Sequence, residues 1–266
     1  SMTTNPGAIV TYVEYDAAGR QVRLVQNWSA GSSSSSSSSG PFESDDTNVT
    51  VLTTYNADGN VSSITAVNSI TGDQTSKYVY GTTLSDSGIA SSLLKRAEIY
   101  PDSDDVADPL GDGTDGIYDR IEFKYNRQGE VTEIKDQNET VHAFDYDNLG
   151  RRTHDRATAL GTGVDGAVRR ISTTYEVRGM ADKLTSWNAE TVGSGSVVNE
   201  AQFTYNDFGQ ITHDYQAHGG TVNTSTTPKV QYGYASGSAN TIRPTTITYP
   251  NGRVITYSYG AADSTS

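Results

Sequence analysis

Four aspartates lie close together in a glycine-rich stretch of the sequence and could bind a metal ion. They are Asp108, Asp112, Asp115 and Asp119. Carboxylate oxygens are the ligands that Ca²⁺ prefers, and glycine lets a loop fold around an ion. The spacing is not that of an EF-hand loop, and acidic glycine-rich loops are commonly solvated turns. The stretch therefore supports two interpretations, a calcium site and an ordinary exposed loop.

Other residue types that carry chemistry show no catalytic pattern. The four histidines lack metal-ligand spacing, and the pairs His154-Asp155 and His213-Asp214 are neighbours whose side chains point to opposite faces of a strand. No serine lies in a Gly-x-Ser-x-Gly elbow. Carboxylate pairs suited to glycoside cleavage stay open, because the fold rather than the spacing sets their geometry. We expect no enzyme activity and no cofactor other than the calcium considered above.

The charge of the chain argues against nucleic acid as a partner. The 266 residues include 19 Lys and Arg against 32 Asp and Glu, which gives a net charge of −13. Such a chain would repel a phosphate backbone unless it had a basic stripe, and none is visible. Hydrophobic residues make up only 34%, and 17 tyrosines supply much of the apolar surface. We therefore expect a thin core built on sheets.

The sequence contains no cysteine and no apolar run long enough to cross a membrane. It also lacks a basic segment followed by an apolar one at its start, so no signal peptide is expected. Ser1 and Met2 are typical of a tag-cleavage scar, and residues 3–266 are expected to form one continuous array. Because Tyr257 to Gly260 is typical of the start of a further unit, we expect a fragment of a longer protein.

A short motif, tyrosine followed four positions later by glycine, recurs along the chain. Repetition at such intervals is typical of architectures in which each unit is one supersecondary element. A seventh, broken copy is Tyr249-Pro250-Asn251-Gly252, one residue short. The six full copies are Tyr15 to Gly19, Tyr55 to Gly59, Tyr125 to Gly129, Tyr146 to Gly150, Tyr175 to Gly179 and Tyr205 to Gly209.

Each copy predicts a β-hairpin. The Asn or Asp that usually follows the tyrosine can open a turn through its side chain, and the glycine supplies the positive φ that a short loop needs. Apolar residues then follow at an odd offset, such as Val131 and Ile134. Strict alternation does not produce that offset. Either a bulge intervenes or the strand changes the face that it buries.

The fold class that follows is all-β, with about sixteen strands in an antiparallel meander that twists and coils. The repeat tyrosines are expected to stack on the buried face and to hydrogen-bond through their hydroxyls between neighbouring units. Three segments interrupt the repeats: a flexible serine-rich loop at 31–40, an irregular acidic insertion at 81–115 and a connector at 157–167. Within the insertion, residues 89–94 fit a helical turn or a short strand.

The motif resembles the Tyr-Asp-x-x-Gly-Arg core of the YD repeat, which is typical of rearrangement-hotspot (RHS) proteins. Tyr15 to Arg20 and Tyr146 to Arg151 match it fully, whereas Asn or Glu replaces Asp in the other four copies. The resemblance implies a ribbon of hairpins that spirals into a shell, as in RHS toxins, the cocoon subunits of Tc toxins and teneurins. Asp108-Pro109-Leu110-Gly111 only faintly resembles the family's autoproteolytic region, so no cleavage activity is implied.

On this resemblance the chain is a non-catalytic structural module of a secreted or cell-surface bacterial protein, whose shell encloses or presents a polypeptide. The partners implied are the other repeats of the parent protein or the enclosed polypeptide. The alternative is an extracellular adhesin or carbohydrate-binding surface, assisted by calcium. An open sheet also leaves two unpaired edges, which favours edge-to-edge dimerisation or protection by the insertion at 81–115.

Overall fold

The computed structural model describes residues 2–4, 10–28, 48–68, 70–235 and 242–259. All regular secondary structure in these residues is β-strand, which confirms the predicted all-β class. This part of the chain holds no helix with the length and hydrophobicity of a membrane span. The chain divides into two compact units, residues 1–139 and residues 140–266. The predicted serine-rich loop at 31–40 lies outside the described residues.

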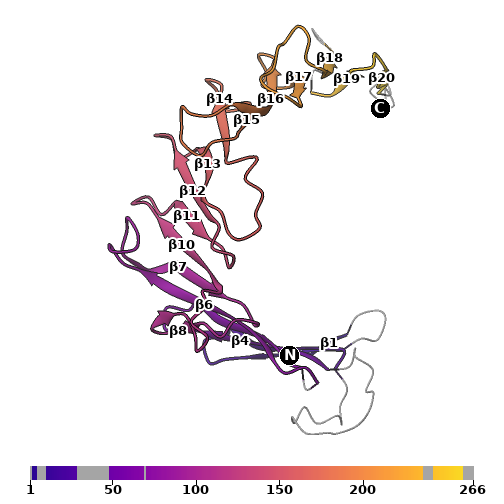
Figure 1. Ribbon diagram of the computed structural model, residues 1–266. Helices are drawn as coiled ribbons and strands as arrows, with labels where there is room; N and C mark the ends of the chain where they lie inside the picture. The colour runs from indigo at the N-terminus through magenta and orange to yellow at the C-terminus, as the bar shows by residue number, and fades with distance from the viewer. Residues whose placement is uncertain (1, 5–9, 29–47, 69, 236–241, 260–266) are drawn as a thin grey trace, which may run out of the picture. The chain divides into compact units, whose positions relative to one another are not determined.

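Unit 1 is an antiparallel meander of nine strands (Figure 1) in which β10 follows β7, and a separate hairpin of β8 and β9 is inserted between them. The strands are β1 (Met2–Thr4), β2 (Val10–Tyr15), β3 (Gln21–Gln26), β4 (Val49–Tyr55), β5 (Val61–Ala66), β6 (Gln74–Thr82), β7 (Ser91–Ile99), β8 (Val106–Ala107), β9 (Leu110–Gly111), β10 (Arg120–Tyr125) and β11 (Val131–Lys135).

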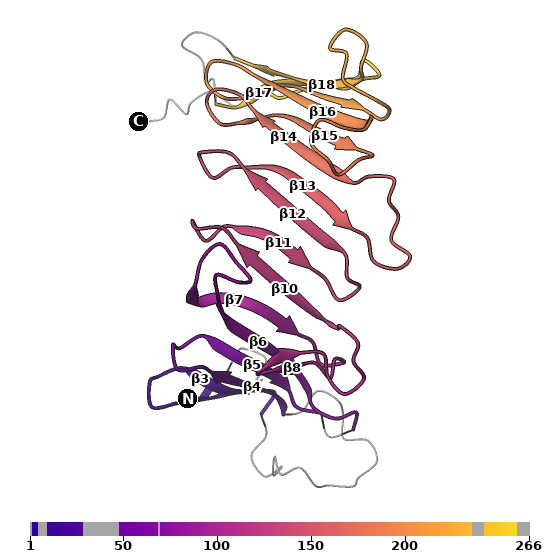
Figure 2. The ribbon, with the colours of Figure 1, turned by 60° about the vertical axis from the view of Figure 1, so that its left-hand side comes forward.

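Unit 2 is a second antiparallel meander of nine strands, and each strand pairs with the next along the chain, as Figure 2 shows for β12 to β18. The strands are β12 (Val141–Tyr146), β13 (Arg152–Ala159), β14 (Arg170–Tyr175), β15 (Ala181–Trp187), β16 (Val197–Tyr205), β17 (Ile211–Ala217), β18 (Lys229–Tyr234), β19 (Pro244–Thr248) and β20 (Val254–Thr256). Together the units hold more strands than the sixteen expected, in part because β7, β8 and β9 lie in the range 81–115 that the sequence analysis took as irregular.

A β-bulge explains the odd offset of the apolar residues after each turn. In β10 and β11, Lys124 pairs with Glu133 but Tyr125 pairs with Val131, so Thr132 is an extra residue. The same shift occurs beside each of the six repeat tyrosines. The bulge places Val131 and Ile134 on the same face of the sheet as Tyr125 and Phe123, their partners on the neighbouring strand. Of the two alternatives left open by the sequence, the structure therefore shows the bulge.

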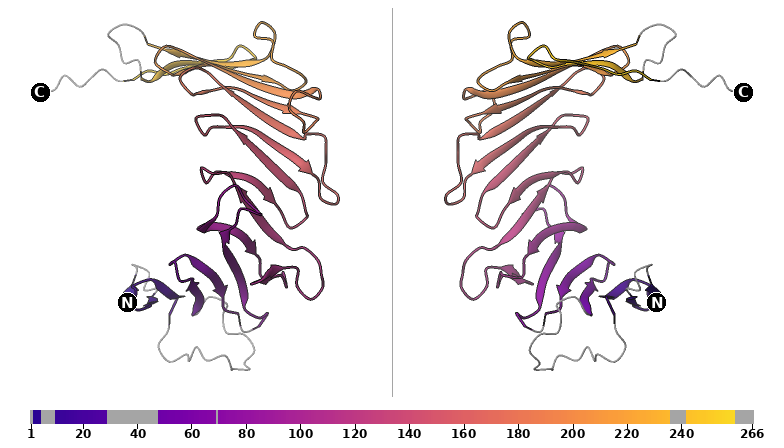
Figure 3. Two further views of the ribbon diagram at one scale, coloured as in Figure 1. Left: turned by 90° about the vertical axis from the view of Figure 1, so that its left-hand side faces the viewer. Right: turned by 90° about the vertical axis from the view of Figure 1, so that its right-hand side faces the viewer.

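The two faces of each sheet differ in chemistry. The tyrosine face, named for the repeat tyrosines on it, also carries apolar residues that stay partly exposed, including Ile64, Ile171 and Leu184. The opposite face, which we call the loop face, holds Val25, Ala97, Ile99 and Tyr215, four of the five buried apolar residues. Buried polar residues such as Arg170, Thr185 and Glu200 lie on it as well. Each unit is a single layer of strands (Figure 3), so the core is as thin as predicted.

The strand ends of each unit form two sides. On the turn side, strands that end in a repeat tyrosine turn back through a short loop. The other set of strand ends, which we call the loop side, carries the other connections and is distinct from the loop face of the sheet. Because strands alternate in direction, the turn at residues 249–253 joins β19 to β20 on the loop side. The sequence suggested that this turn is a seventh copy of the repeat, but its place on the loop side shows that it is not. Its Tyr249 takes the turn position that Asp, Asn or Glu occupies in the six copies, and the carbonyl of Tyr249 accepts from the Gly252 N–H at 2.9 Å.

The range 81–115 contains more regular structure than its sequence indicated. Residues 91–99 form β7, an ordinary strand of the meander, which decides between the helical turn and the strand expected at 89–94. Residues 100–119 form the connection from β7 to β10 and carry the β8–β9 hairpin. Asp105 in this connection bonds to Arg120 on the loop face, so the segment packs on a face of the sheet.

Candidate functional site: the turn side and the acidic loop

All six copies of the motif close the same turn. In the first, the N–H of Asp16 donates to the carbonyl of Arg20 at 2.9 Å, and the N–H of Gly19 donates back to the carbonyl of Asp16 at 3.0 Å. Equivalent pairs of bonds close the other five copies. The six glycines have φ between 76° and 92°, a region that residues with a Cβ rarely adopt. The glycine is thus required by the turn itself.

The residue after the tyrosine fixes the turn through its side chain. Asp16 Oδ1 accepts from the N–H groups of Ala18 and Arg20, both at 2.9 Å. Asp147 and the Asn residues at 126 and 206 make the same two contacts in their own turns. Either side chain has the oxygen that the turn requires. The Asp-to-Asn changes along the chain therefore preserve the turn.

The residue after the glycine varies together with this Asp or Asn. Asp147 bonds to Arg151 at 2.6 Å, as Asp16 does to Arg20. At Asn126 and Asn206 the side-chain Nδ2 instead donates to an acceptor, Glu130 Oε2 at 2.6 Å and Gln210 Oε1 at 2.7 Å. These two looser copies are therefore complementary exchanges, because an anion with a cation becomes an amide with an acceptor.

The repeat tyrosines join each hairpin to the one before it. Tyr175 Oη donates to the carbonyl of Arg152 at 2.8 Å, and Tyr205 Oη donates to the carbonyl of Ala181 at 2.8 Å. Arg152 and Ala181 each begin the bulge opposite the preceding tyrosine. In unit 1, Tyr55 Oη reaches Gln21 in the same way at 2.8 Å. The bulge thus presents a carbonyl that the next phenol hydroxyl satisfies.

Three further tyrosines make or support the same link although none of them begins a copy of the motif, and they are Tyr80, Tyr234 and Tyr259. Tyr80 pairs with Lys95 beside a bulge, and the carbonyl of Lys95 accepts from Tyr125 Oη at 2.6 Å. Tyr234 pairs with Pro244, whose carbonyl accepts from Tyr259 Oη at 2.9 Å. Longer loops follow Tyr80 and Tyr234, so neither has the glycine four residues on. One sign of these units remains in the sequence, because strands that end in tyrosine alternate with strands that do not.

In the two full matches the arginine also covers the next tyrosine. The guanidinium of Arg20 lies 4.4 Å from the ring centre of Tyr55, and that of Arg151 lies 4.3 Å from the ring centre of Tyr175. Such stacking of a guanidinium on a ring is attractive. Its ion pair with Asp147 holds Arg151 in this place. The Asp, Gly and Arg of the motif therefore act together on the neighbouring hairpin.

The repeat tyrosines differ in how far they are buried. Tyr125 is 8% exposed and has a pKa raised by burial, whereas Tyr15 is 53% exposed. Tyr125 is also covered by the loop between β6 and β7, because Ser87 Oγ accepts from its N–H at 3.0 Å and its carbonyl accepts from the N–H of Gly88. The tyrosines thus share one position in the repeat, but we expect them to contribute unequally to the free energy of unfolding.

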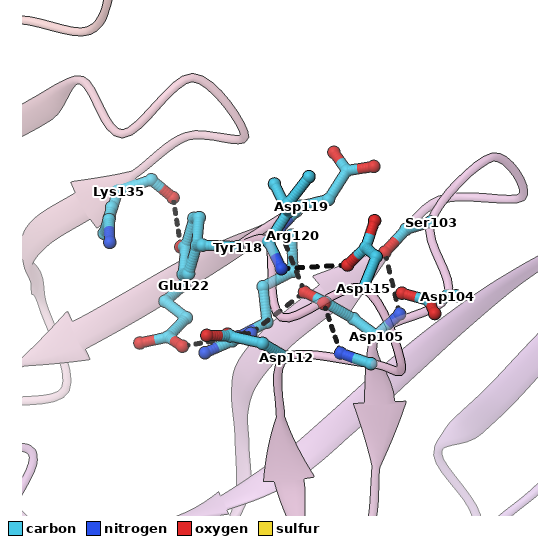
Figure 4. A network of polar contacts seen from close by, with 12 residues as sticks. Ser103, Asp104, Asp105, Asp112, Asp115, Tyr118, Asp119, Arg120, Glu122 and Lys135 are labelled. Carbon is cyan, nitrogen blue, oxygen red and sulfur yellow. Dashed lines mark hydrogen bonds and ion pairs between the residues drawn. The ribbon is translucent and has the colours of Figure 1, made fainter.

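The acidic loop of unit 1 is organised around a buried ion pair (Figure 4). Asp105 is fully buried, and its Oδ2 accepts from Arg120 Nη1 at 2.9 Å. The same carboxylate accepts from the N–H groups of Gly113 and Asp119. Arg120 also contacts Asp112 at 2.7 Å. Buried charges are stable only when they are paired in this way, so the contacts hold the loop against the sheet.

The four predicted metal ligands have separate environments. Asp112 is engaged by Arg120, and Asp115 Oδ1 accepts from the N–H of Ile117 at 2.8 Å. Asp108 is exposed before a cis peptide bond to Pro109. Burial, together with the nearby carboxylates, raises the pKa of Asp119. In the part of the chain that the structure describes, no three His, Asp or Glu side chains are grouped as metal ligands. Calcium binding here stays a prediction.

Two histidines pair across strands rather than with their sequence neighbours. His142 Nδ1 lies 2.6 Å from Asp155 Oδ1, and His154 Nδ1 lies 2.9 Å from Ser172 Oγ. Burial lowers the pKa of His154. These contacts could not be inferred from sequence spacing, because they depend on strand register. Ser172 lies on the loop face and is almost fully buried, so its hydroxyl is poorly placed for a substrate.

Buried polar side chains also hold two loops of unit 2 to the loop face. Arg170 is 2% exposed and donates to the carbonyls of Ala189, Thr191 and Ser194 in the connection from β15 to β16. Glu200 accepts from the N–H of Val222 at 3.0 Å in the connection from β17 to β18. These loops are therefore built into the fold.

Comparison of the sequence with protein-family models and with curated proteins gives no match. Solved structures do match. The crystal structure of TcdB2-TccC3-TEV is 9% identical with a TM-score of 0.41, over 88% of this chain and 12% of that chain. The Photorhabdus luminescens Tc holotoxin pore, with a mutation in TccC3, is 13% identical with a TM-score of 0.54. That match covers 92% of this chain and 11% of the other.

The chain has the fold of the RHS/YD-repeat shell proteins. The resemblance drawn from the Tyr-Asp-x-x-Gly-Arg motif is thus confirmed at the level of fold, and so is the repeated hairpin. The likeness lies in the hairpin sheet, because the identity is low. The chain spans only 11 to 12% of the length of these two chains. A role for this hairpin sheet must therefore rest on its own residues.

Proposed function

We propose that the chain is a non-catalytic wall module of a secreted or cell-surface bacterial RHS-type protein, and that its parent shell encloses or presents a polypeptide. The hydrogen bonds from four repeat tyrosines to the preceding bulge carry the proposal, and these are Tyr55, Tyr125, Tyr175 and Tyr205. A phenol hydroxyl links one hairpin to the hairpin before it, so the unit can be repeated without a change of chemistry. The other repeats of the parent protein are then its principal partners.

The tyrosine face suits contact with an unfolded polypeptide. Ile64, Ile171 and Leu184 lie on it and are each more than one third exposed, although they are apolar. Exposed apolar side chains on a sheet are typical of binding surfaces when they are contiguous. In unit 2, Ile171 and Leu184 lie on the adjacent strands β14 and β15. An extended chain with scattered apolar residues could bind there without a specific sequence.

The adhesin alternative has less support in the residues. It depends on calcium in the acidic loop, where the carboxylates of Asp105 and Asp112 already form ion pairs with Arg120. Binding to a glycan array that is lost on addition of a chelator would favour this alternative over the wall module.

The test of the wall module uses a permanently unfolded probe, a reduced and carboxymethylated polypeptide labelled with a fluorophore. We expect saturable binding that is weakened at least about tenfold by Ile171→Lys with Leu184→Lys. The matched control is Val164→Lys with Val192→Lys, two exposed apolar residues in loop-side connections of the same unit. Equal binding by both variants, or no binding by the parent chain, would count against the tyrosine face as the contact surface.

A further inference from the structure

Arg170 is a buried cation whose contacts, within the part of the chain that the structure describes, include no carboxylate. It is 2% exposed and donates to the carbonyls of Ala189, Thr191 and Ser194. Burial lowers the pKa of Arg170, because main-chain dipoles replace only part of the hydration that the charge has lost. Such a charge is sensitive to any further positive charge beside it.

These bonds from Arg170 hold the connection from β15 to β16 on the loop face, and we call them the arginine clasp. The connection also bonds to itself, because the N–H of Asn188 donates to the carbonyl of Ser196 at 3.2 Å. Its single carboxylate, that of Glu190, bonds to Arg169 at 3.0 Å rather than to Arg170. The attachment of the connection to the sheet therefore depends largely on one guanidinium.

A serine hydroxyl joins the arginine clasp to a histidine on the neighbouring strand β13. Ser172 Oγ accepts from Arg170 Nε at 3.3 Å and lies 2.9 Å from His154 Nδ1. A guanidinium can only donate, so the hydroxyl proton of Ser172 is left for His154. Nδ1 is then the acceptor, which assigns the proton of the neutral imidazole to Nε2. In this state one hydroxyl satisfies both side chains.

Charged side chains from three strands surround His154. Asp145 on β12 lies opposite it, Arg156 follows it on β13, and Arg170 comes from β14. Asp145 already accepts two bonds from Arg156, at 2.7 and 2.9 Å. Burial lowers the pKa of His154, and the two arginines add to this against the opposing effect of Asp145. The site therefore favours the neutral imidazole.

We propose that protonation of His154 opens the arginine clasp, so that a mildly acidic medium releases the connection from β15 to β16 from the loop face. A proton on Nδ1 turns the acceptor into a donor, and the hydroxyl of Ser172 can no longer donate to it. An imidazolium and a guanidinium then meet at one hydroxyl oxygen, while Asp145 is paired with Arg156. This inference rests on unit 2 alone and is independent of the wall-module proposal.

The direction of the pH effect follows from the neutral form of His154. A histidine that the closed connection holds neutral stabilises it above the ordinary pKa of 6.5. That stabilisation is lost as the pH falls from 6.5 through the lower value of the folded state. Aspartate and glutamate titrate at about pH 4, so the interval between about pH 7.5 and about pH 5.5 reports on the histidines.

Hydrogen exchange of the whole chain, followed by mass spectrometry, tests the proposal. Peptides that cover residues 188–196 report on the closed connection, because the N–H groups of Asn188 and Ser194 are bonded within it. Exchange rates are corrected for the intrinsic rate at each pH. We expect the protection of these peptides to fall at least about threefold between about pH 7.5 and about pH 5.5.

Substitution of two histidines at equivalent positions locates the effect. His154→Asn keeps an acceptor oxygen at the place of Nδ1 but does not titrate, so the loss of protection should disappear. The matched control is His213→Asn, because His213 Nδ1 contacts Thr204 Oγ1 at 2.9 Å and burial also lowers its pKa. The control should lose protection as the parent chain does. Unchanged protection in the parent chain, a loss retained by His154→Asn, or a loss abolished by His213→Asn would overturn the proposal.

A second measurement uses the parent chain alone and applies even if His154→Asn does not fold. The pH midpoint at which residues 188–196 lose protection should coincide with the titration of the His154 imidazole followed by NMR. A midpoint that follows another histidine, or one that lies in the carboxylate range, would refute the link to the arginine clasp.

Discussion

Tyr175 and Arg152 are joined by a hydrogen bond of 2.8 Å from the phenol hydroxyl to the main-chain carbonyl. The carbonyl belongs to the first residue of a bulge, and the ring of Tyr175 lies under Arg151, the residue before Arg152 in the chain. Two successive residues of one hairpin thus contact one side chain of the next. This arrangement explains why tyrosine, rather than phenylalanine, recurs at this place.

The burial of the repeat tyrosines predicts unequal losses of stability. Tyr125→Ala removes a ring that is 8% exposed, and we expect it to lower the free energy of unfolding by about 3 kcal/mol. Tyr15→Ala removes a ring that is 53% exposed and should cost much less. Urea denaturation of the two variants measures the difference. Equal losses would show that the position, rather than burial, sets the contribution.

The turn glycines are expected to resist substitution. Gly179 has a φ of 92°, so Gly179→Ala forces a side chain into a backbone conformation that it rarely adopts. We expect a loss of roughly 1 to 2 kcal/mol in thermal or urea unfolding. Gly219→Ala is the control, because Gly219 has no positive φ and its added Cβ would meet nothing within 4 Å. A control variant that is as destabilised as Gly179→Ala would contradict the backbone argument.

The ion pair under the acidic loop should be essential for unit 1. Asp105→Ala leaves the buried guanidinium of Arg120 without one of its carboxylates, and such losses cost about 3 to 5 kcal/mol. Asp115→Ala changes an exposed residue of the same loop and should cost well under that amount. Chemical denaturation compares the two variants. If Asp105→Ala unfolds like the parent chain, the loop does not depend on this pair.

Acid should weaken the turns that carry Asp with Arg. Hydrogen bonds from Arg151 lower the pKa of Asp147 below its ordinary value of 3.8, and the backbone and side chain of Arg20 lower that of Asp16. A carboxyl group with a lowered pKa in the folded state stabilises the fold above its unfolded pKa. That stabilisation is lost as the pH falls from 3.8 through the folded value.

The matched variant removes this titration without removing the turn. Asp147→Asn with Arg151→Gln supplies the amide pair found at Asn206 and Gln210. We expect its urea midpoint to fall less than that of the parent chain between pH 5 and pH 3. An identical pH dependence for both proteins would show that Asp147 does not contribute.

The sequence specified the hairpins because their determinants are local. Tyr175 and Gly179 lie within one turn, and a positive φ and a side-chain oxygen are enough to predict it. The bulge was left undecided because it depends on pairing with the opposite strand. Tyr80 and Tyr234 were missed because longer loops follow them. Tyr249 was interpreted as the start of a broken seventh copy, because the sequence of the turn alone does not show on which side of the sheet the turn lies.

Contacts between distant residues were beyond the reach of the sequence. Asp105 and Arg120 are separated by the whole acidic loop, and nothing in their spacing distinguishes this buried pair from the exposed aspartates around it. His142 and Asp155 meet only because β12 and β13 pair in one register. In both cases the partner is set by how the strands align, which is a property of the folded sheet.

The hydroxyls of Tyr55, Tyr125, Tyr175 and Tyr205 each bond to the hairpin directly before their own. A recombination event that duplicates or deletes a complete hairpin would therefore leave the surviving links with equivalent donors and acceptors. A cut in the middle of a hairpin would instead separate a bulge from the tyrosine opposite it. The length of such a protein can therefore change by one pair of strands at a time, without changes to the sequences of the neighbouring hairpins.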